Sequence, residues 1–448
     1  MPTHVPDHPR PPGRLPLLGD ALSLRRDPLG FLESLRGLAD LAELRIGPQR
    51  VYLPTTAALT RSVLTEQARH FHKGAQFEKL RPVIGDGLAS AEGRAHRRQR
   101  ALVQPAFHRS RFPAYLRVAA RTTADRVDSW QDGRTLEMDR QMYRLAASIG
   151  TRILYHSHLD DGSEAVIDDA GLTVVRGIGK RVTAPFGLAE RLPTPTNRRY
   201  RAAVASLHQV VSHIVEARRD DGHDHHDLLS VLLHSQDRAT GDRLTDQQVH
   251  DEVITMLGGA TESTAVSLSW TLYELARHPD VELRVLEELD TALGARDITV
   301  DDLDALPLLR RVVDETLRLE GPAWMLTRRV AGTVEVGGRT LPAGTALWYS
   351  PYLLHHDPAA YPDPHRFDPD RWLTTPAGAT GDAMFIPFGA GIRACVGESL
   401  ARAELLVVLA TLLQRWRFHL VPGARVRKVA GFVLSPSSLP MTVTRRPR

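Results

Sequence analysis

The sequence predicts a mainly α-helical protein with small β-sheets at its edge. Long stretches of the chain repeat apolar residues at three- and four-residue spacing, which is the pattern of helices with one buried face. Strand patterns are few and short. The chain has 448 residues, more than the about 250–300 at which a single core usually stops growing, so length alone favours two domains. However, the linker-like stretches 223–227, 233–243 and 374–382 are short and separate no two compositions, so we expect one domain over residues 13–448.

The N-terminal part begins with an arm and a hairpin. Residues 1–12 are rich in proline, which favours extended conformations, and we expect a loose arm there. The N-terminus has neither a signal-peptide pattern nor an apolar run of about 18 residues, so we expect a cytoplasmic protein without a membrane anchor. Residues 41–54 predict a β-hairpin that turns at Gly47-Pro48.

The rest of the chain alternates long helical patterns with a few strands. Residues 332–351 predict two strands joined by a turn at Gly337-Gly338, and residues 431–436 predict another strand. The helical patterns cover residues 164–182, 200–220, 251–270, 314–320 and 396–416.

Charge and cysteine content exclude several classes of protein. Lys and Arg number 57 against 53 Asp and Glu, a net charge of +4 that is too balanced to favour nucleic-acid binding. It is compatible with one basic face that docks an acidic protein. A single cysteine excludes an internal disulfide framework and any zinc site built on several thiolates, and it suits a reducing compartment.

That cysteine lies in the segment FGAGIRACVG, residues 388–397. Gly389 and Gly391 allow a tight turn and a close approach of the backbone to a flat group. Arg393 can pair with a carboxylate. The helical pattern begins at about Cys395, where the helix N-terminus stabilises a thiolate, and Gly397 leaves space beside it. A haem satisfies all of these features, with iron on sulfur, a propionate on arginine and the porphyrin against the glycines.

Other interpretations of the cysteine exist. A buried structural cysteine in a glycine-rich loop is the ordinary one. A catalytic thiol is another, but no adjacent histidine or asparagine is evident to activate it.

The segment resembles the haem-ligand signature of the cytochrome P450 family, Phe-x-x-Gly-x-Arg-x-Cys-x-Gly. The fixed positions are Phe388, Gly391, Arg393, Cys395 and Gly397. The resemblance covers nearly the whole chain. It implies a triangular helical body with haem b between a long central helix and the cysteine-bearing helix.

A second motif is a pair of charges, Glu315 and Arg318, which share a helix face at i and i+3. Alone, such a pair is usually a solvated surface contact. The resemblance implies the family's Glu-x-x-Arg motif, a buried structural network behind the haem that Arg366 in DPHRFDPDRW completes.

The helical stretch 251–270 carries polar residues in an apolar pattern, and a kinked core helix would also explain it. It resembles the family's central helix, whose small residues open a groove for dioxygen next to an acid and an alcohol. By that resemblance Ala260 takes a small position, where glycine is usual. Glu262 is the acid and Ser263, where threonine is usual, is the alcohol, with Thr264 sharing proton delivery.

Four residues are expected to donate to the haem propionates by resemblance. His96, which replaces the family's usual tryptophan, and Arg100 share a helix face at i and i+4. Arg329 and His355 are the further donors. A basic surface helix and a core histidine are the plainer interpretations.

The substrate pocket is expected to be apolar, which favours a hydrophobic substrate. Similarity to bacterial sesquiterpene-oxidising members favours a sesquiterpene over a fatty acid or a polyketide. The expected lining residues are Ala323, Trp324, Met325, Leu326, Val433 and Leu434.

The resemblance implies a monooxygenase that inserts one oxygen atom of O2 into its substrate. The sequence has no Gly-x-Gly-x-x-Gly nucleotide-binding unit, so electrons from NAD(P)H must arrive through a separate ferredoxin and ferredoxin reductase. A monomer is expected.

Two alternatives stay open at this point. One is a haem-binding protein or peroxygenase without ferredoxin-driven turnover. The other is a magnesium-dependent terpene cyclase activity based on Asp220, Asp221 and Asp224, although a solvated linker is the ordinary interpretation of these residues. Zinc binding by neighbouring histidines has the same standing, with the candidates His223, His225 and His226.

Overall fold

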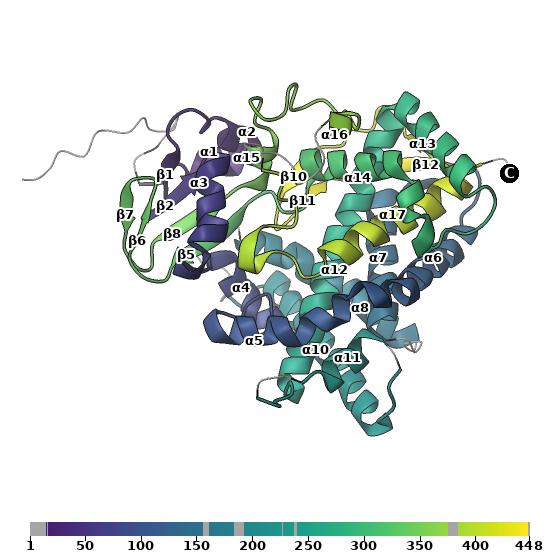
Figure 1. The fold of residues 1–448 in the computed structure, drawn as a ribbon, viewed down its shortest axis with the longest axis horizontal. Coiled ribbons are helices and arrows are strands. Elements are labelled where there is room, and N and C mark those ends of the chain that lie inside the picture. The colour runs from purple at the N-terminus through teal and green to yellow at the C-terminus, as the bar shows by residue number, and fades with distance from the viewer. Residues whose placement is uncertain are drawn as a thin grey trace, which may run out of the picture.

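A computed structural model shows the arrangement of the chain. It describes residue 15 and residues 17–155, 161–182, 192–225, 227–236, 240–374 and 384–446. The expected arm, 1–12, lies outside these residues, so it stays a prediction, as does the extent of the single domain. The fold is mainly α-helical with small separate sheets, as the sequence predicts. Figure 1 shows most of the strands on one side of the molecule and the long helices on the other.

The described residues form sixteen α-helices. The first eight are α1 (Ala21–Arg26), α2 (Pro28–Glu33), α3 (Ala57–Arg61), α4 (Ala75–Ile84), α5 (Gly93–Val103), α6 (Phe112–Asp128), α7 (Met138–Leu154) and α8 (Asp161–Val182). The others are α10 (Pro195–Asp221), α11 (Leu228–His234), α12 (Asp246–Arg277), α13 (Pro279–Ala292), α14 (Pro307–Glu320), α15 (Pro351–His355), α16 (Arg371–Thr374) and α17 (Glu398–Arg415).

The largest sheet has the strand order β1-β2-β8-β5-β3. Its strands are β1 (Leu41–Ile46), β2 (Gln49–Pro54), β3 (Phe71–Lys73), β5 (Leu326–Val330) and β8 (Ala346–Tyr349). Strands β1 and β2 form the predicted hairpin, with Leu41 opposite Pro54. Strand β2 runs parallel to β8, and the other neighbours are antiparallel.

The remaining sheets are small. Strands β6 (Val334–Val336) and β7 (Arg339–Leu341) pair around Gly337 and Gly338, both with positive φ, which confirms the predicted turn. The last strands are β4 (Thr135–Glu137), β9 (Trp416–Leu420), β10 (Lys428–Ala430), β11 (Leu434–Pro436) and β12 (Pro440–Arg445). Strand β12 lies between β4 and β9, and β10 pairs with β11.

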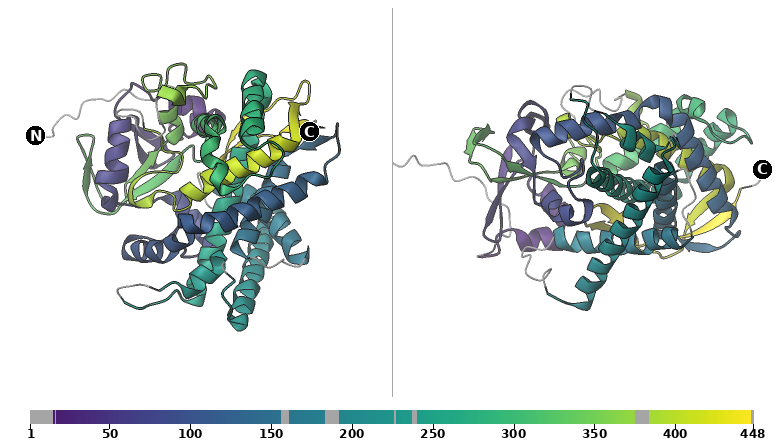
Figure 2. Two further views of the ribbon diagram at one scale, coloured as in Figure 1. Left: turned by 45° about the vertical axis from the view of Figure 1, so that its right-hand side comes forward. Right: turned by 90° about the horizontal axis from the view of Figure 1, so that it is seen from below.

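Helix α12 is the long central helix. It begins with a capping box, in which Thr245 accepts from the backbone of Gln248 and the Gln248 side chain accepts from the backbone of Thr245. It packs against α7, α10, α14 and α17, so residues from Val249 to Leu275 are largely buried, while the terminal Asp246 and Arg277 are exposed. Figure 2 shows, in two further views, the strand-rich part of the molecule beside the helical body.

The predicted helices differ from the observed ones mainly at their ends. Residues 164–182 and 200–220 fall within α8 and α10. The C-terminal pattern 396–416 corresponds to α17, which begins at Glu398 with Gly397 as its N-cap. The strand predicted over 431–436 is shorter, because only Leu434–Pro436 pair with β10.

Candidate active site

The cysteine segment forms a closed loop before α17. The Cys395 N–H donates to the carbonyl of Phe388 over 2.9 Å, which joins the two ends of the loop. Gly391 has φ +68°, and a Cβ there would lie 2.0 Å from the carbonyl oxygen of Leu64, so only glycine fits. Gly389, at φ +74°, also needs the left-handed conformation. The loop therefore has one shape, which the glycines permit.

Cys395 is accessible, yet it lies deep within the protein. The residue keeps exposed surface, while burial raises the pKa of its thiol. Both observations agree if the sulfur faces internal space rather than the outer surface. The backbone N–H groups of Gly397 and Glu398 point at the sulfur and lower the pKa, but burial outweighs them. The start of the helix therefore favours the thiolate, in the direction that the sequence predicts, while burial opposes it.

The middle of α12 also keeps accessible surface. Gly258, Gly259 and Ala260 are exposed, although the residues on both sides of them in the helix are largely buried. A Cβ on either glycine would meet nothing within 4 Å apart from the helix's own backbone. A long buried helix that exposes its smallest residues leaves room there for another group.

The polar residues of this stretch divide between two faces. The Ser263 hydroxyl donates to the carbonyl of Gly259 over 2.6 Å, so Ser263 shares the face of the open stretch. Thr264, one position on, lies about 100° further around the helix and is buried. The structure therefore separates Thr264 from Ser263, contrary to the expectation that they act together.

Burial raises the pKa of Glu262 to about 7, and no charged partner opposes this effect within the described part of the chain. A carboxyl group with this pKa gains and loses a proton readily near neutral pH. The chemistry of Glu262 therefore suits the acid role that the sequence predicts.

A cluster of cations lies beside the cysteine loop. Lys73, on β3, is directly opposite Arg328, on β5, and both side chains are buried. Arg393 forms an ion pair with Glu92, and Arg100 donates to the carbonyl of Ala394 over 2.6 Å. Like charges placed opposite each other destabilise a sheet, so nearby anions are needed to stabilise this pair.

The cations of this cluster lower one another's pKa values. Burial, followed by Arg393, lowers the pKa of Lys73 to about 7. Burial, followed by Lys73 and Arg393, lowers the pKa of His96 to about 4, so His96 is a neutral member of the cluster. Sequence reasoning missed Lys73, whose single charge in a short strand gives no signal.

Arg329 lies on the other side of β5. Its guanidinium pairs with Glu78 through contacts of 2.9 and 2.8 Å, in a partly exposed position. Successive strand residues face opposite sides, so only one of Arg328 and Arg329 can point at the cation cluster. The structure gives that position to Arg328, and the prediction for Arg329 is wrong.

His355 is a core residue, not a donor to a bound group. Its Nε2 accepts from the backbone N–H of Ile386 over 2.9 Å, and its carbonyl accepts from Arg318 over 2.8 Å. Burial lowers the pKa of the ring to about 3. The neutral ring thus fixes the segment before the cysteine loop, and the predicted propionate contact is wrong.

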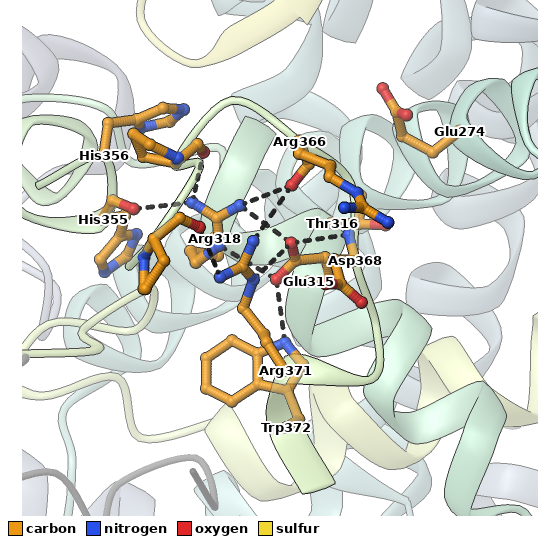
Figure 3. Close-up of polar contacts among 12 residues, drawn as sticks. Glu274, Glu315, Thr316, Arg318, His355, His356, Arg366, Asp368, Arg371 and Trp372 are labelled. Carbon is orange, nitrogen blue, oxygen red and sulfur yellow. Dashed lines mark hydrogen bonds and ion pairs between the residues drawn. The ribbon is translucent and has the colours of Figure 1, made fainter. Parts of the chain in front are cut away.

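The Glu-x-x-Arg pair is buried, as predicted. Arg318 donates to Glu315 over 2.9 and 3.0 Å, and neither side chain is exposed. Arg318 also donates to the carbonyls of His355 and Pro364. Figure 3 shows this pair at the centre of a network that ties α14 to α15 and to the segment before α16.

The arginine that completes the network is Arg371, not Arg366. Arg371 donates its Nε to Glu315 over 2.9 Å, and Trp372 donates its indole N–H over 3.0 Å. Arg366 is exposed and takes part only through its carbonyl oxygen (Figure 3). The segment DPHRFDPDRW holds two Arg-aromatic pairs, and sequence reasoning chose the first of them.

The chain is similar to known proteins over nearly its whole length. The sequence profile of cytochrome P450 matches residues 9–442. The chain belongs to the cytochrome P450 family. It is 43% identical over 433 residues to cyclooctat-9-en-7-ol 5-monooxygenase of Streptomyces melanosporofaciens, covering 96% of this chain and 94% of the relative. It is 39% identical over 440 residues to pentalenene oxygenase of Streptomyces avermitilis, covering 97% of each. The protein is therefore a cytochrome P450 monooxygenase.

The residues of this P450 fit a haem with its propionates. In the cation cluster, Glu92 pairs with Arg393, and burial raises the pKa of the nearby Glu252 to about 7. Positive charge is thus in excess, and the Nε of Arg393 is buried without a hydrogen-bond partner in the described part of the protein. Propionate carboxylates would supply both the missing charge and the missing acceptor.

The two segments predicted to line the substrate pocket lie together in this P450. The Trp324 indole donates to the carbonyl of Gly431 over 2.9 Å, and the Leu434 N–H donates to the carbonyl of Pro322 over 3.0 Å. Trp324, Met325, Val433 and Leu434 are largely buried in packed hydrophobic clusters, and their role in lining the pocket stays a prediction. The partly exposed Ala323 and Leu326 likewise remain candidates for lining it.

The aspartate-rich segment at the end of α10 forms contacts with its own histidines. Asp221 accepts from His223 over 3.0 Å and also pairs with His225. Across the described parts of the chain, no group of three His, Cys, Asp or Glu side chains could hold a metal ion. His226 lies outside those parts. The segment thus gives no structural support for a magnesium or zinc site.

None of the helices in the described ranges combines the length and apolar character needed to cross a membrane.

Proposed function

We propose that this cytochrome P450 monooxygenase oxidises a sesquiterpene or a diterpene. The observation that carries this substrate class is the match to relatives whose names refer to terpenes, each aligned over at least 91% of both chains. The third of them is cyclooctatin synthase of Streptomyces melanosporofaciens, 39% identical over 418 residues. The apolar segments around residues 323–326 and 431–434 suit a hydrocarbon substrate.

Cys395 is the residue that would hold the iron of haem b through its sulfur. When bound, haem b supplies the activation of O2 and the transfer of one oxygen atom into a C–H or C=C bond. The sulfur is accessible from inside the protein, and the N–H groups of Gly397 and Glu398 stabilise negative charge on it. Phe388 fixes the loop by accepting the Cys395 N–H.

The cation cluster holds the propionates in this proposal. Arg328 and Arg393 can each form paired hydrogen bonds with a carboxylate, and Lys73 adds a point charge. Arg100 fixes the loop next to the sulfur through the carbonyl of Ala394. His96, neutral and buried, can donate one ring N–H.

Ser263 and Glu262 control proton supply in this proposal. The Ser263 hydroxyl donates a hydrogen bond to the carbonyl of Gly259. Its oxygen lone pairs are therefore free to accept a hydrogen bond from a water molecule in the open stretch of α12. Glu262 takes up a proton near neutral pH and releases it again, since burial places its pKa at about 7. The carboxyl oxygen of Glu262 and the hydroxyl of Ser263 are therefore the proton-handling atoms.

Electrons reach this P450 from a partner protein, which we propose is a ferredoxin reduced by NAD(P)H through a reductase. Helix α5 carries the exposed Arg94 and Arg97 close in sequence to Arg100, which contacts the cysteine loop. An acidic ferredoxin is the electrostatic complement of such a face.

The test is a spectral titration of the haem-loaded enzyme with sesquiterpenes, diterpenes and fatty acids. A type I shift with terpenes, followed by oxygenated product that requires NADPH, ferredoxin and reductase, is the expected result. Binding of fatty acids alone would overturn the substrate proposal. Product formed with hydrogen peroxide but never with ferredoxin would instead show a peroxygenase.

A further inference from the structure

Arg402, on α17, contacts two of the three residues whose backbones hold Cys395. Its guanidinium carbon lies 5.0 Å from the centre of the Phe388 ring. Its Nε donates to Glu398 over 3.2 Å. Phe388 accepts the N–H of Cys395, and the N–H of Glu398 points at the cysteine sulfur. One side chain therefore connects Phe388 and Glu398, two of the three residues whose backbone groups fix the proposed ligand.

Arg402 is itself held in place from a third element. It forms an ion pair with Asp314 on α14, and the side chain of Asp314 is 8% exposed. A second ring, that of Phe385, lies 5.8 Å from the guanidinium. A cation fixed by two carboxylates and two aromatic faces has little freedom, so its charge stays at one distance from the loop.

The charges around the loop have opposite effects on the sulfur. Glu398 is an anion that opposes negative charge on Cys395. Arg402 pairs with Glu398 and so counters this effect. Without the arginine, Glu398 would stand uncompensated near the sulfur.

We propose that Arg402 is a positioning residue for Cys395 that also raises the reduction potential of the haem bound there. The inference rests on the proposed role of Cys395 as the haem ligand. A reduced haem with a thiolate ligand carries one more negative charge than the oxidised form. A fixed cation nearby stabilises the reduced form more, while Glu398 acts in the opposite direction.

The experiment measures the midpoint potential of the ferric–ferrous couple in purified, haem-loaded enzyme without any partner protein. Arg402→Met should shift the ferric–ferrous equilibrium toward ferric by about three- to tenfold, tenfold corresponding to 59 mV for a one-electron couple. Glu398→Gln should shift it toward ferrous by a similar factor. Arg402→Lys, which keeps the charge, should recover most of the wild-type value.

The control is Arg284→Met. Arg284 forms a pair of 2.9 Å contacts with Asp370 on another part of the surface, so its loss should leave the potential unchanged. A purely structural role for Arg402 would move Arg402→Met and Glu398→Gln in the same direction. Equal potentials in all variants, or shifts of one sign, would overturn the inference.

The carbon monoxide difference spectrum separates this inference from the proposed function. The absorption band that gives the family its name should be present in the wild type and in all four variants. If the wild type lacks the band, thiolate ligation by Cys395 is wrong. If the band is present and the potentials do not differ, only the role of Arg402 is wrong. Should Arg402→Met fail to fold, Arg402→Lys and Glu398→Gln still give the sign of the effect.

Discussion

Lys73 and Arg328 lie directly opposite each other on neighbouring strands, and both side chains are buried. Two cations in this position repel each other unless an anion lies between them. Lys73 donates to the carbonyl of Leu88 over 2.6 Å, and Arg328 donates to the Tyr349 hydroxyl over 3.2 Å, so neither side chain is neutralised by these contacts. We therefore expect this pair of cations to bind the haem propionates.

Arg328→Met should weaken haem retention by about tenfold or more, because a hydrogen bond to a charged group contributes about 1.5–3 kcal/mol. The measurement is the fraction of haem that apomyoglobin removes from the purified protein. Arg329→Met is the matched control, since Arg329 pairs with Glu78 at a partly exposed site. Equal haem loss from the two variants would contradict the assignment of Arg328 to the propionates.

Arg371→Met should destabilise the fold by about 3–5 kcal/mol, the usual effect of removing one partner from a buried ion pair. Its side chain is 11% exposed and bonds to Glu315, which is fully buried. Arg366→Met should change stability by less than about 0.5 kcal/mol, because an exposed side chain of this kind contributes little. Denaturant unfolding of the haem-loaded enzyme compares the two. A larger loss in Arg366→Met would restore the original interpretation of the motif.

The sequence predicted more of the fold than of the site. Helical periodicity located α8, α10, α12 and α17 because long patterns average out local exceptions. Spacing also located Cys395 and the Glu315–Arg318 pair, since these depend on residues close together in the chain.

The errors share a physical cause. Arg329 was preferred to Arg328, and Arg366 to Arg371, although each pair differs only in which side chain faces inward. That choice depends on strand pairing and on distant partners such as Glu315, which a single sequence does not show. The prediction for His355 was wrong for a related reason. Its ring accepts the backbone N–H of Ile386, a residue distant in the chain.

Ser263→Ala should uncouple NADPH consumption from product formation, because the hydroxyl next to Gly259 is the proposed proton carrier. The ratio of product formed to NADPH consumed should fall several-fold, with haem content unchanged. Thr264→Val is the matched control, since Thr264 is buried away from the face of Gly259 and valine keeps its shape. Full coupling in Ser263→Ala, or equal loss in Thr264→Val, would argue against the assignment.

Product formation should decline as pH rises through about 7 because proton supply needs the protonated carboxyl of Glu262. Burial raises the pKa of this group to about 7, so the protonated form predominates below that pH and is lost above it. The measurement is the rate of product formation from pH 5.5 to 8.5, at about half-unit steps, with saturating ferredoxin. Glu262→Gln should be slower and should lack this decline.

Glu404→Gln is the control for this pH dependence. Burial also raises the pKa of Glu404 to about 7, but the residue lies on α17, a different helix from the open stretch of α12. Its replacement should therefore leave the decline intact, since a general effect of pH on the protein would persist in both variants. If Glu262→Gln keeps the wild-type profile, the decline belongs to another group and Glu262 is not the proton donor.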